Sequence, residues 1–212
     1  MSGPDSPVIG VEDAPSRWSP WWLASGALFI ASALLAAFRS LPGSGDVNAL
    51  VGVSTAATLA FSLALVAAGI GAVRHDHTLR LPRVAIISLF LLAVWLPVAL
   101  PVLTASFGIT SAAPLYLNAL VKLGLSGAIV AGVLRSVLPS PWRLIPAIAL
   151  AVVVLGSLLE VAFMSGSVTD QGAMILVSNV LTLVRILATG ALGAVALRAA
   201  RSRAGSVVVF GG

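Results

Sequence analysis

The chain has 212 residues, of which 59% are hydrophobic and only 9% are charged, and its mean hydropathy is +1.09. A soluble domain carries about 25% charged residues, so this composition excludes an ordinary soluble protein and indicates a membrane protein. The net charge is +5, but the basic residues are spread between apolar segments without a basic stripe, so we expect no nucleic-acid partner. The absence of cysteine excludes disulfides, thiolate metal sites and cysteine nucleophiles.

The apolar segments predict an all-α fold, in which one domain crosses the lipid bilayer six times. A membrane helix needs about 20 mostly apolar residues. The predicted helices cover residues 22–38, 49–73, 84–105, 114–137, 143–164 and 172–197. We expect the flanking residues 1–20 and 201–212 to be cytoplasmic tails, the first one disordered because it is polar and rich in proline, serine and glycine.

The first, second and fourth predicted helices carry features typical of membrane packing. Trp18, Trp21 and Trp22 stand at the start of the first helix, where aromatic side chains anchor a protein to the membrane interface. Small residues at every fourth position let neighbouring helices approach closely. Such rows are Ala56, Ala60, Ala64 and Ala68 in the second helix, and Gly124, Ala128 and Gly132 in the fourth.

The loop after the second helix holds both histidines, and the third helix holds two prolines. His75 and His77 flank Asp76, but a zinc site needs three or four ligands and the neighbouring arginines repel a cation, so we expect no metal. No predicted helix contains a histidine that could ligate haem, and no other cofactor is expected. Pro97 and Pro101 each remove a backbone donor and predict a kink in the outer half of the third helix.

The arginines predict the orientation of the chain, because cytoplasmic loops of membrane proteins carry an excess of basic residues. With the N-terminus inside, the outer loops contain only Arg39. The inner segments contain Arg17, Arg74, Arg80, Arg83, Arg135, Arg143, Arg198, Arg201 and Arg203. We therefore expect a multi-pass protein of a bacterial-type plasma (inner) membrane with both ends in the cytoplasm.

A polar stripe runs down the sixth predicted helix. Arg185 lies near its middle, where a guanidinium costs at least about 2.5 kcal/mol unless water or a partner surrounds it. Ser178, Thr182 and Thr189 share the face of Arg185 at helical spacing. We expect this stripe to point into the bundle.

Four charged or polar residues of the fourth, fifth and sixth helices lie inside the bilayer, and three of them lie at a similar depth. At 1.5 Å per residue, Glu160, Asn179, Lys122 and Arg185 lie about 7, 9, 10 and 18 Å below the outer boundary. Helices joined by short connections are antiparallel neighbours, so Glu160 is predicted to lie between Lys122 and Arg185, with Lys122 the closer partner. The candidate substrate-binding residues are Asn118, Lys122, Ser126, Glu160, Asn179, Thr182 and Arg185.

These buried charges support two functional interpretations. In the first, the protein handles a small polar or anionic solute, as a transporter or as the permease or substrate-recognition subunit of a membrane complex. In the second, it is a non-catalytic structural or assembly subunit whose charges form a closed salt bridge and whose small-residue rows bind other membrane subunits. Neither interpretation is an enzyme.

Two resemblances to known families accompany these interpretations. A 21.4 kDa chain with six membrane helices is similar to the substrate-binding subunits of energy-coupling vitamin transporters. Ala27 with Ala31, or Ala33 with Ala37, offers an AxxxA motif like the one on the first helix of that family. This resemblance implies substrate recognition in the membrane, coupled to partner subunits.

The segment Gly124-Leu125-Ser126-Gly127 resembles the GxSG segment that carries the nucleophile on the fourth helix of rhomboid proteases, which have a six-helix core. The resemblance implies an intramembrane serine hydrolase as a third alternative. The chain lacks the histidines of that family's second and sixth helices, and the large loop after its first helix. Lys122, one turn before Ser126, is the only substitute base.

Overall fold

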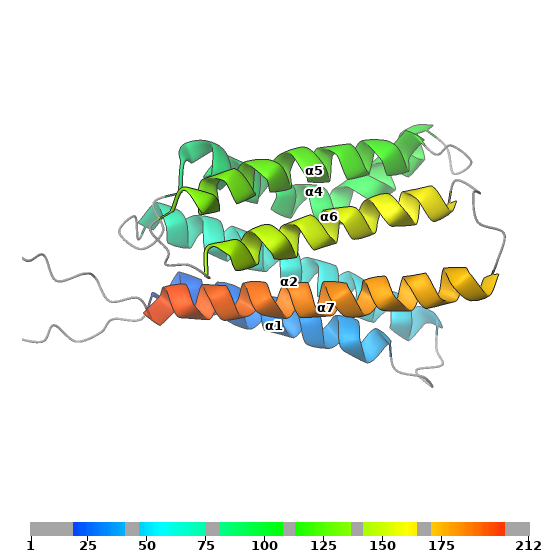
Figure 1. The fold of residues 1–212 in the computed structure, drawn as a ribbon, viewed down its shortest axis with the longest axis horizontal. Helices are drawn as coiled ribbons and strands as arrows, with labels where there is room; N and C mark the ends of the chain where they lie inside the picture. Colours follow the sequence, from blue (N-terminus) through cyan, green and yellow to red (C-terminus); the bar gives the residue numbers. More distant parts are fainter. Residues whose placement is uncertain are drawn as a thin grey trace, which may run out of the picture.

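The structure, a computed structural model, describes residues 19–40, 47–74, 81–107, 113–136, 142–164 and 171–201. The regular structure in these ranges is entirely helical, which confirms the predicted all-α fold (Figure 1). The helices are α1 (Pro20–Arg39), α2 (Val47–Arg74), α4 (Arg83–Phe107), α5 (Ala113–Leu134), α6 (Leu144–Met164) and α7 (Gln171–Arg201). Most of the two expected tails, and the segment with His75, Asp76 and His77, lie outside the described residues.

Four helices, α1, α2, α5 and α7, are long and apolar enough to cross a membrane. A fifth span is formed by α4 if its two bent parts count as one crossing. Large apolar side chains cover the outside of the bundle, for example Leu34, Leu120 and Leu187, each at least 65% exposed. Such a surface is unfavourable in water and suits lipid, so the chain is a multi-pass membrane protein. The sixth crossing, through α6, stays a prediction.

The helices form a closed ring. Each helix packs against the next one along the chain, and α7 returns to pack against α1. The backbone N–H of Ser19, just before α1, donates to the carbonyl of Ala200 near the end of α7 (3.3 Å). The two ends of the described chain therefore meet at one end of the bundle, as the sequence predicted.

Small residues bring α1 close to both of its neighbours. A Cβ atom at Gly26 would lie 2.7 Å from Leu197 Cγ and 3.1 Å from the carbonyl oxygen of Gly193, so α1 and α7 cross almost backbone to backbone. Against α2, the buried hydroxyl of Ser25 donates to the carbonyl of Ala64 (2.9 Å). Ala64 and Ala68 are buried inside the bundle, so this part of the small-residue row serves internal packing and is not open to a partner subunit.

The predicted kink in the third predicted helix is confirmed. Its counterpart α4 bends by 51° between Arg83–Ala99 and Pro101–Phe107. Proline removes a backbone donor and its ring clashes with the preceding turn, which explains a bend at this position.

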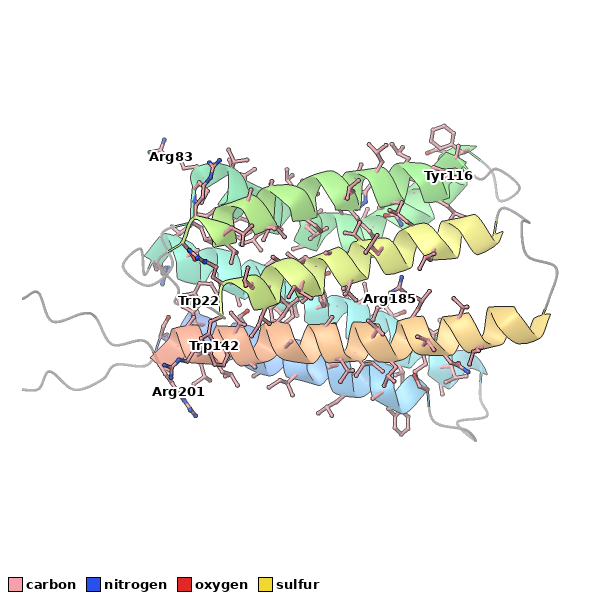
Figure 2. All side chains as sticks on the ribbon, viewed as in Figure 1. Trp22, Arg83, Tyr116, Trp142, Arg185 and Arg201 are labelled. Carbon is pink, nitrogen blue, oxygen red and sulfur yellow. The ribbon has the colours of Figure 1, made fainter. Side chains whose placement is uncertain are left out.

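One end of the bundle is strongly basic, as the sequence predicted (Figure 2). Among the described residues, the arginines at this end are Arg74, Arg83, Arg135, Arg143, Arg198 and Arg201. Arg39 lies at the opposite end. We call the basic end the inner end and the opposite end the outer end.

The tryptophans at the start of α1 differ in role. Trp21 lies at the inner end with the guanidinium of Arg74 5.4 Å from its ring centroid, as expected of an interfacial side chain. Trp22, also predicted to be an interfacial anchor, is instead buried among the helices and only 5% exposed. Gly71 of α2 leaves the room that its indole needs, because a Cβ atom there would lie 3.0 Å from Nε1.

Candidate functional site

Arg185 projects from the middle of α7 toward α6 (Figure 2). It lies about 21 Å from the first residue of α7 and about 24 Å from the last. A Cβ atom on Gly156 of α6 would lie 3.2 Å from Arg185 Nε and 3.5 Å from Nη2. The guanidinium thus uses space that a glycine leaves open. Because Arg185 is half-buried against a neighbouring helix, its predicted orientation into the bundle is confirmed.

The second intramembrane cation, Lys122 of α5, is also half-buried and lies on the face of its helix that points to the bundle axis. It precedes Ile129 by two turns, and Arg185 precedes Leu192 by the same spacing. Ile129 and Leu192 both line a cavity at the axis. The two cations therefore lie on the outer side of that cavity, on helix faces that are turned inward. Each of them has an interaction partner.

Asn118, one turn outward of Lys122, is joined to α4. The indole Nε1 of Trp95 donates to its Oδ1 at 3.0 Å, and both side chains are half-buried. This bond fixes α4 against α5 in the outer half of the bundle. The sequence singled out Asn118 as a candidate substrate-binding residue but did not identify Trp95 as its partner, because the two residues lie on different helices.

Ser126, the serine of the GxSG segment, is buried and only 5% exposed. The two glycines around it point elsewhere, since Cβ atoms on Gly124 and Gly127 would meet nothing within 4 Å. At Gly132, by contrast, a Cβ atom would lie 2.5 Å from that of Ala85. The predicted small-residue row of α5 thus packs against α4 only near its inner end, and its outer part faces away from the bundle.

The polar stripe of α7 holds only in part. Thr189 is buried, and Thr182 is half-buried with its hydroxyl donating to the carbonyl of Ser178 in its own helix (2.8 Å). Ser178 and Asn179 are exposed. The expected inward orientation of the stripe is therefore wrong at Ser178.

The acidic member of the predicted site is only partly placed. Glu160 follows Gly156 by one turn of α6, but its side chain lies outside the described part of the structure. Its predicted pairing with Lys122 or Arg185 therefore stays a prediction.

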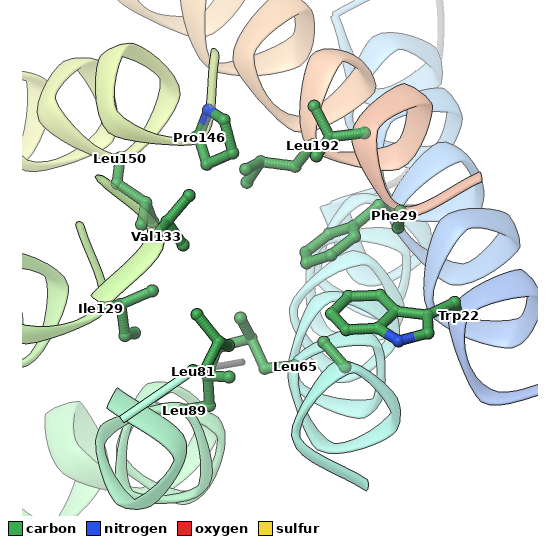
Figure 3. A pocket seen from close by; sticks show the side chains of 13 residues that line it. Trp22, Phe29, Leu65, Leu81, Leu89, Ile129, Val133, Pro146, Leu150 and Leu192 are labelled. Atoms are coloured by element: carbon green, nitrogen blue, oxygen red, sulfur yellow. The ribbon is translucent and has the colours of Figure 1, made fainter. Parts of the chain in front are cut away.

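A cavity of about 70 Å³ lies at the bundle axis in the inner half, and sequence reasoning did not identify it (Figure 3). Each of the six described helices contributes to its lining, including Trp22 and Phe29 from α1 and Leu150 from α6. Every lining side chain in the described part of the chain is hydrophobic, so we expect the cavity to exclude water. No local pattern could reveal it, because only closure of the ring brings these residues together.

Comparison of the chain with protein family models, with curated proteins and with solved structures finds no match. The inner half of the bundle surrounds an apolar cavity, and its outer half carries two cations on inward-facing surfaces.

Proposed function

We propose that the protein handles a small polar or anionic solute in a bacterial-type plasma membrane, as a transporter or as the permease or substrate-recognition subunit of a membrane complex. The main support is the position of Arg185, whose guanidinium lies at mid-depth between α6 and α7 in the space left by Gly156. Arginine keeps its charge at accessible pH, so it attracts an anion wherever the bundle admits one. The proposal includes six membrane crossings, with both ends of the chain in the cytoplasm.

The proposed path enters from the outer end. Lys122 and Arg185 precede cavity-lining residues of their helices by two turns, so a solute that moves inward along the axis meets both cations before it meets the apolar cavity. Glu160 is the proposed acidic member of this site, where it balances one of the two positive charges. Intramembrane ionisable groups are expensive and mostly mark solute or ion pathways.

Ligand-induced stabilisation of the purified protein tests this proposal. Unfolding midpoints are measured with small anions, such as phosphate, sulfate and dicarboxylates, and with neutral solutes of similar size. We expect at least one anion to raise the midpoint of the wild type and to have no effect on Arg185→Gln. Arg83→Gln, which removes an exposed cation at the inner end of α4, serves as the matched control and should keep the response.

The assembly-subunit interpretation remains the second candidate, and a specific observation favours it. Gly124 and Gly127 face outward from α5 with nothing within 4 Å of their Cβ positions, which suits contact with a helix of another subunit. In that case no solute stabilises the protein, and Arg185→Gln lowers its stability because a buried pair loses one member. The charge-swapped variant with Glu160→Arg and Arg185→Glu then recovers part of the loss.

A further inference from the structure

A second hollow lies on the side of the bundle, between α6 and α7, and has a volume of about 270 Å³. We call it the α6–α7 groove. Its lining consists of Ile145, Ile148, Ala149 and Val152 from α6, and of Val184, Leu187, Ala188 and Ala191 from α7. Ala149 and Ala188 are buried and form its floor, whereas Ile148 and Leu187 are 62% and 65% exposed and form its rims. The groove is therefore apolar along all of its described lining residues and opens to the outside of the bundle, where lipid lies.

The inner end of the groove carries an aromatic residue and a cation. Trp142 precedes Ile145 by one turn, and Arg198 follows Ala191 by two turns on the same face of α7. The guanidinium of Arg198 lies 5.8 Å from the ring centroid of Trp142. Arg143, the next residue on the α6 side, is exposed. Figure 2 shows Trp142 at the same end of the bundle as Arg201. Tryptophan and arginine together mark the level of the lipid headgroups.

The length of the groove fits one leaflet of a bilayer. From Arg198 to Val184, the outermost lining residue of α7, the helix rises by about 21 Å. One leaflet contributes about 15 Å of hydrocarbon and about 5–7 Å of headgroup region, so a lipid whose headgroup lies at Arg198 reaches the end of the groove within its own leaflet. A partner helix fits less well, because closely packed membrane helices meet through small residues and the rims here are isoleucine and leucine.

We propose that the α6–α7 groove holds an acyl chain of an anionic phospholipid from the inner leaflet, whose phosphate is bound by Arg198. The apolar lining accepts the chain, and the guanidinium of Arg198 complements the negative headgroup. The site differs from the proposed solute site, since it opens sideways to lipid and Arg185 is not part of its lining, although its outer end at Val152 and Val184 adjoins the contact between Arg185 and Gly156.

The headgroup part of the site is tested with the purified full-length protein in detergent. Native mass spectrometry compares its retention of phosphatidylglycerol and of phosphatidylcholine with identical acyl chains. We expect the wild type to prefer phosphatidylglycerol, and Arg198→Gln to lower the apparent affinity for that lipid about fivefold. The affinity for phosphatidylcholine should fall by less, because its choline group offsets the charge of the phosphate. Arg198→Lys keeps the charge and should keep the preference. Arg83→Gln, at the same end of the bundle on α4, is the matched control and should have no effect.

The acyl-chain part is tested by filling the groove. Ala191→Phe places a ring inside it and should reduce the retention of both lipids, whereas Ala194→Phe, at an exposed position of α7 outside the groove, should reduce neither. Equal retention of the two lipids by the wild type overturns the proposal, as does an equal loss from Arg83→Gln and Arg198→Gln. A wild-type dimer that Ala191→Phe dissociates also overturns it, because the groove is then an interface between protein subunits.

Discussion

Replacing Gly156 by leucine is expected to expel the guanidinium of Arg185 from the space between α6 and α7. A single Cβ atom at this position would already lie 3.2 Å from Nε, 3.5 Å from Nη2 and 3.7 Å from Cζ. Alanine needs only a shift of a few tenths of an ångström by a flexible side chain, and it gains about 1 kcal/mol of helix propensity over glycine. Gly156→Ala should therefore change stability by no more than about 1 kcal/mol.

Leucine has three further carbon atoms, which occupy the volume of the guanidinium itself. Arg185 must then turn toward lipid or distort the helix pair. An arginine at the centre of a membrane helix costs about 2.5–3.5 kcal/mol, so Gly156→Leu should lower the free energy of unfolding by about that amount. Gly190→Leu on α7 is the matched control, because a Cβ atom there meets nothing within 4 Å, and it should have little effect.

A double-mutant cycle separates this mechanism from general crowding. Free energies of unfolding are measured by titration with a denaturing detergent, with circular dichroism as the readout, for Gly156→Leu, Arg185→Leu and the double variant. If the guanidinium occupies the space beside Gly156, the double variant is more stable than the sum of the single effects predicts, by about 0.5–3 kcal/mol. Additive effects, or equal losses from Gly156→Leu and Gly190→Leu, would refute the reasoning.

Two further predictions concern the packing of α1. Gly26→Ala should destabilise the bundle by about 1–3 kcal/mol in the same assay, because the new Cβ atom would lie 2.7 Å from Leu197 Cγ. Gly52→Ala, at a position with open space around it, should not destabilise the bundle. Equal effects of the two substitutions would contradict the close crossing of α1 and α7. Ser25→Ala removes the buried hydrogen bond to the carbonyl of Ala64 and should cost about 0.5–1.5 kcal/mol. An unchanged free energy of unfolding would show that this bond contributes nothing to the packing of α1 on α2.

Local sequence determined the helices, their approximate ends and the position of both described chain ends at one end of the bundle. A run of apolar residues must become helical in a bilayer, since every backbone polar group needs an internal partner there, so segments predicted from hydropathy end near the observed bounds. Pro97 and Pro101 predicted the bend of α4, because a missing backbone donor acts within the helix itself. The arginines predicted that both described chain ends lie at one end of the bundle, which the contact between Ser19 and Ala200 confirms.

The tertiary structure decided which face of each helix points inward. In water the hydrophobic pattern marks the buried face, but here lipid and protein interior are both apolar, so the sequence of α1 could not show that Trp22 is buried while Trp21 meets Arg74. The polar stripe of α7 predicted the inward face reliably only at Arg185, because a charged side chain cannot face lipid without a large cost. Two features depend on closure of the ring of described helices, which no single segment encodes. They are the contact of Arg185 with Gly156 and the apolar cavity at the axis.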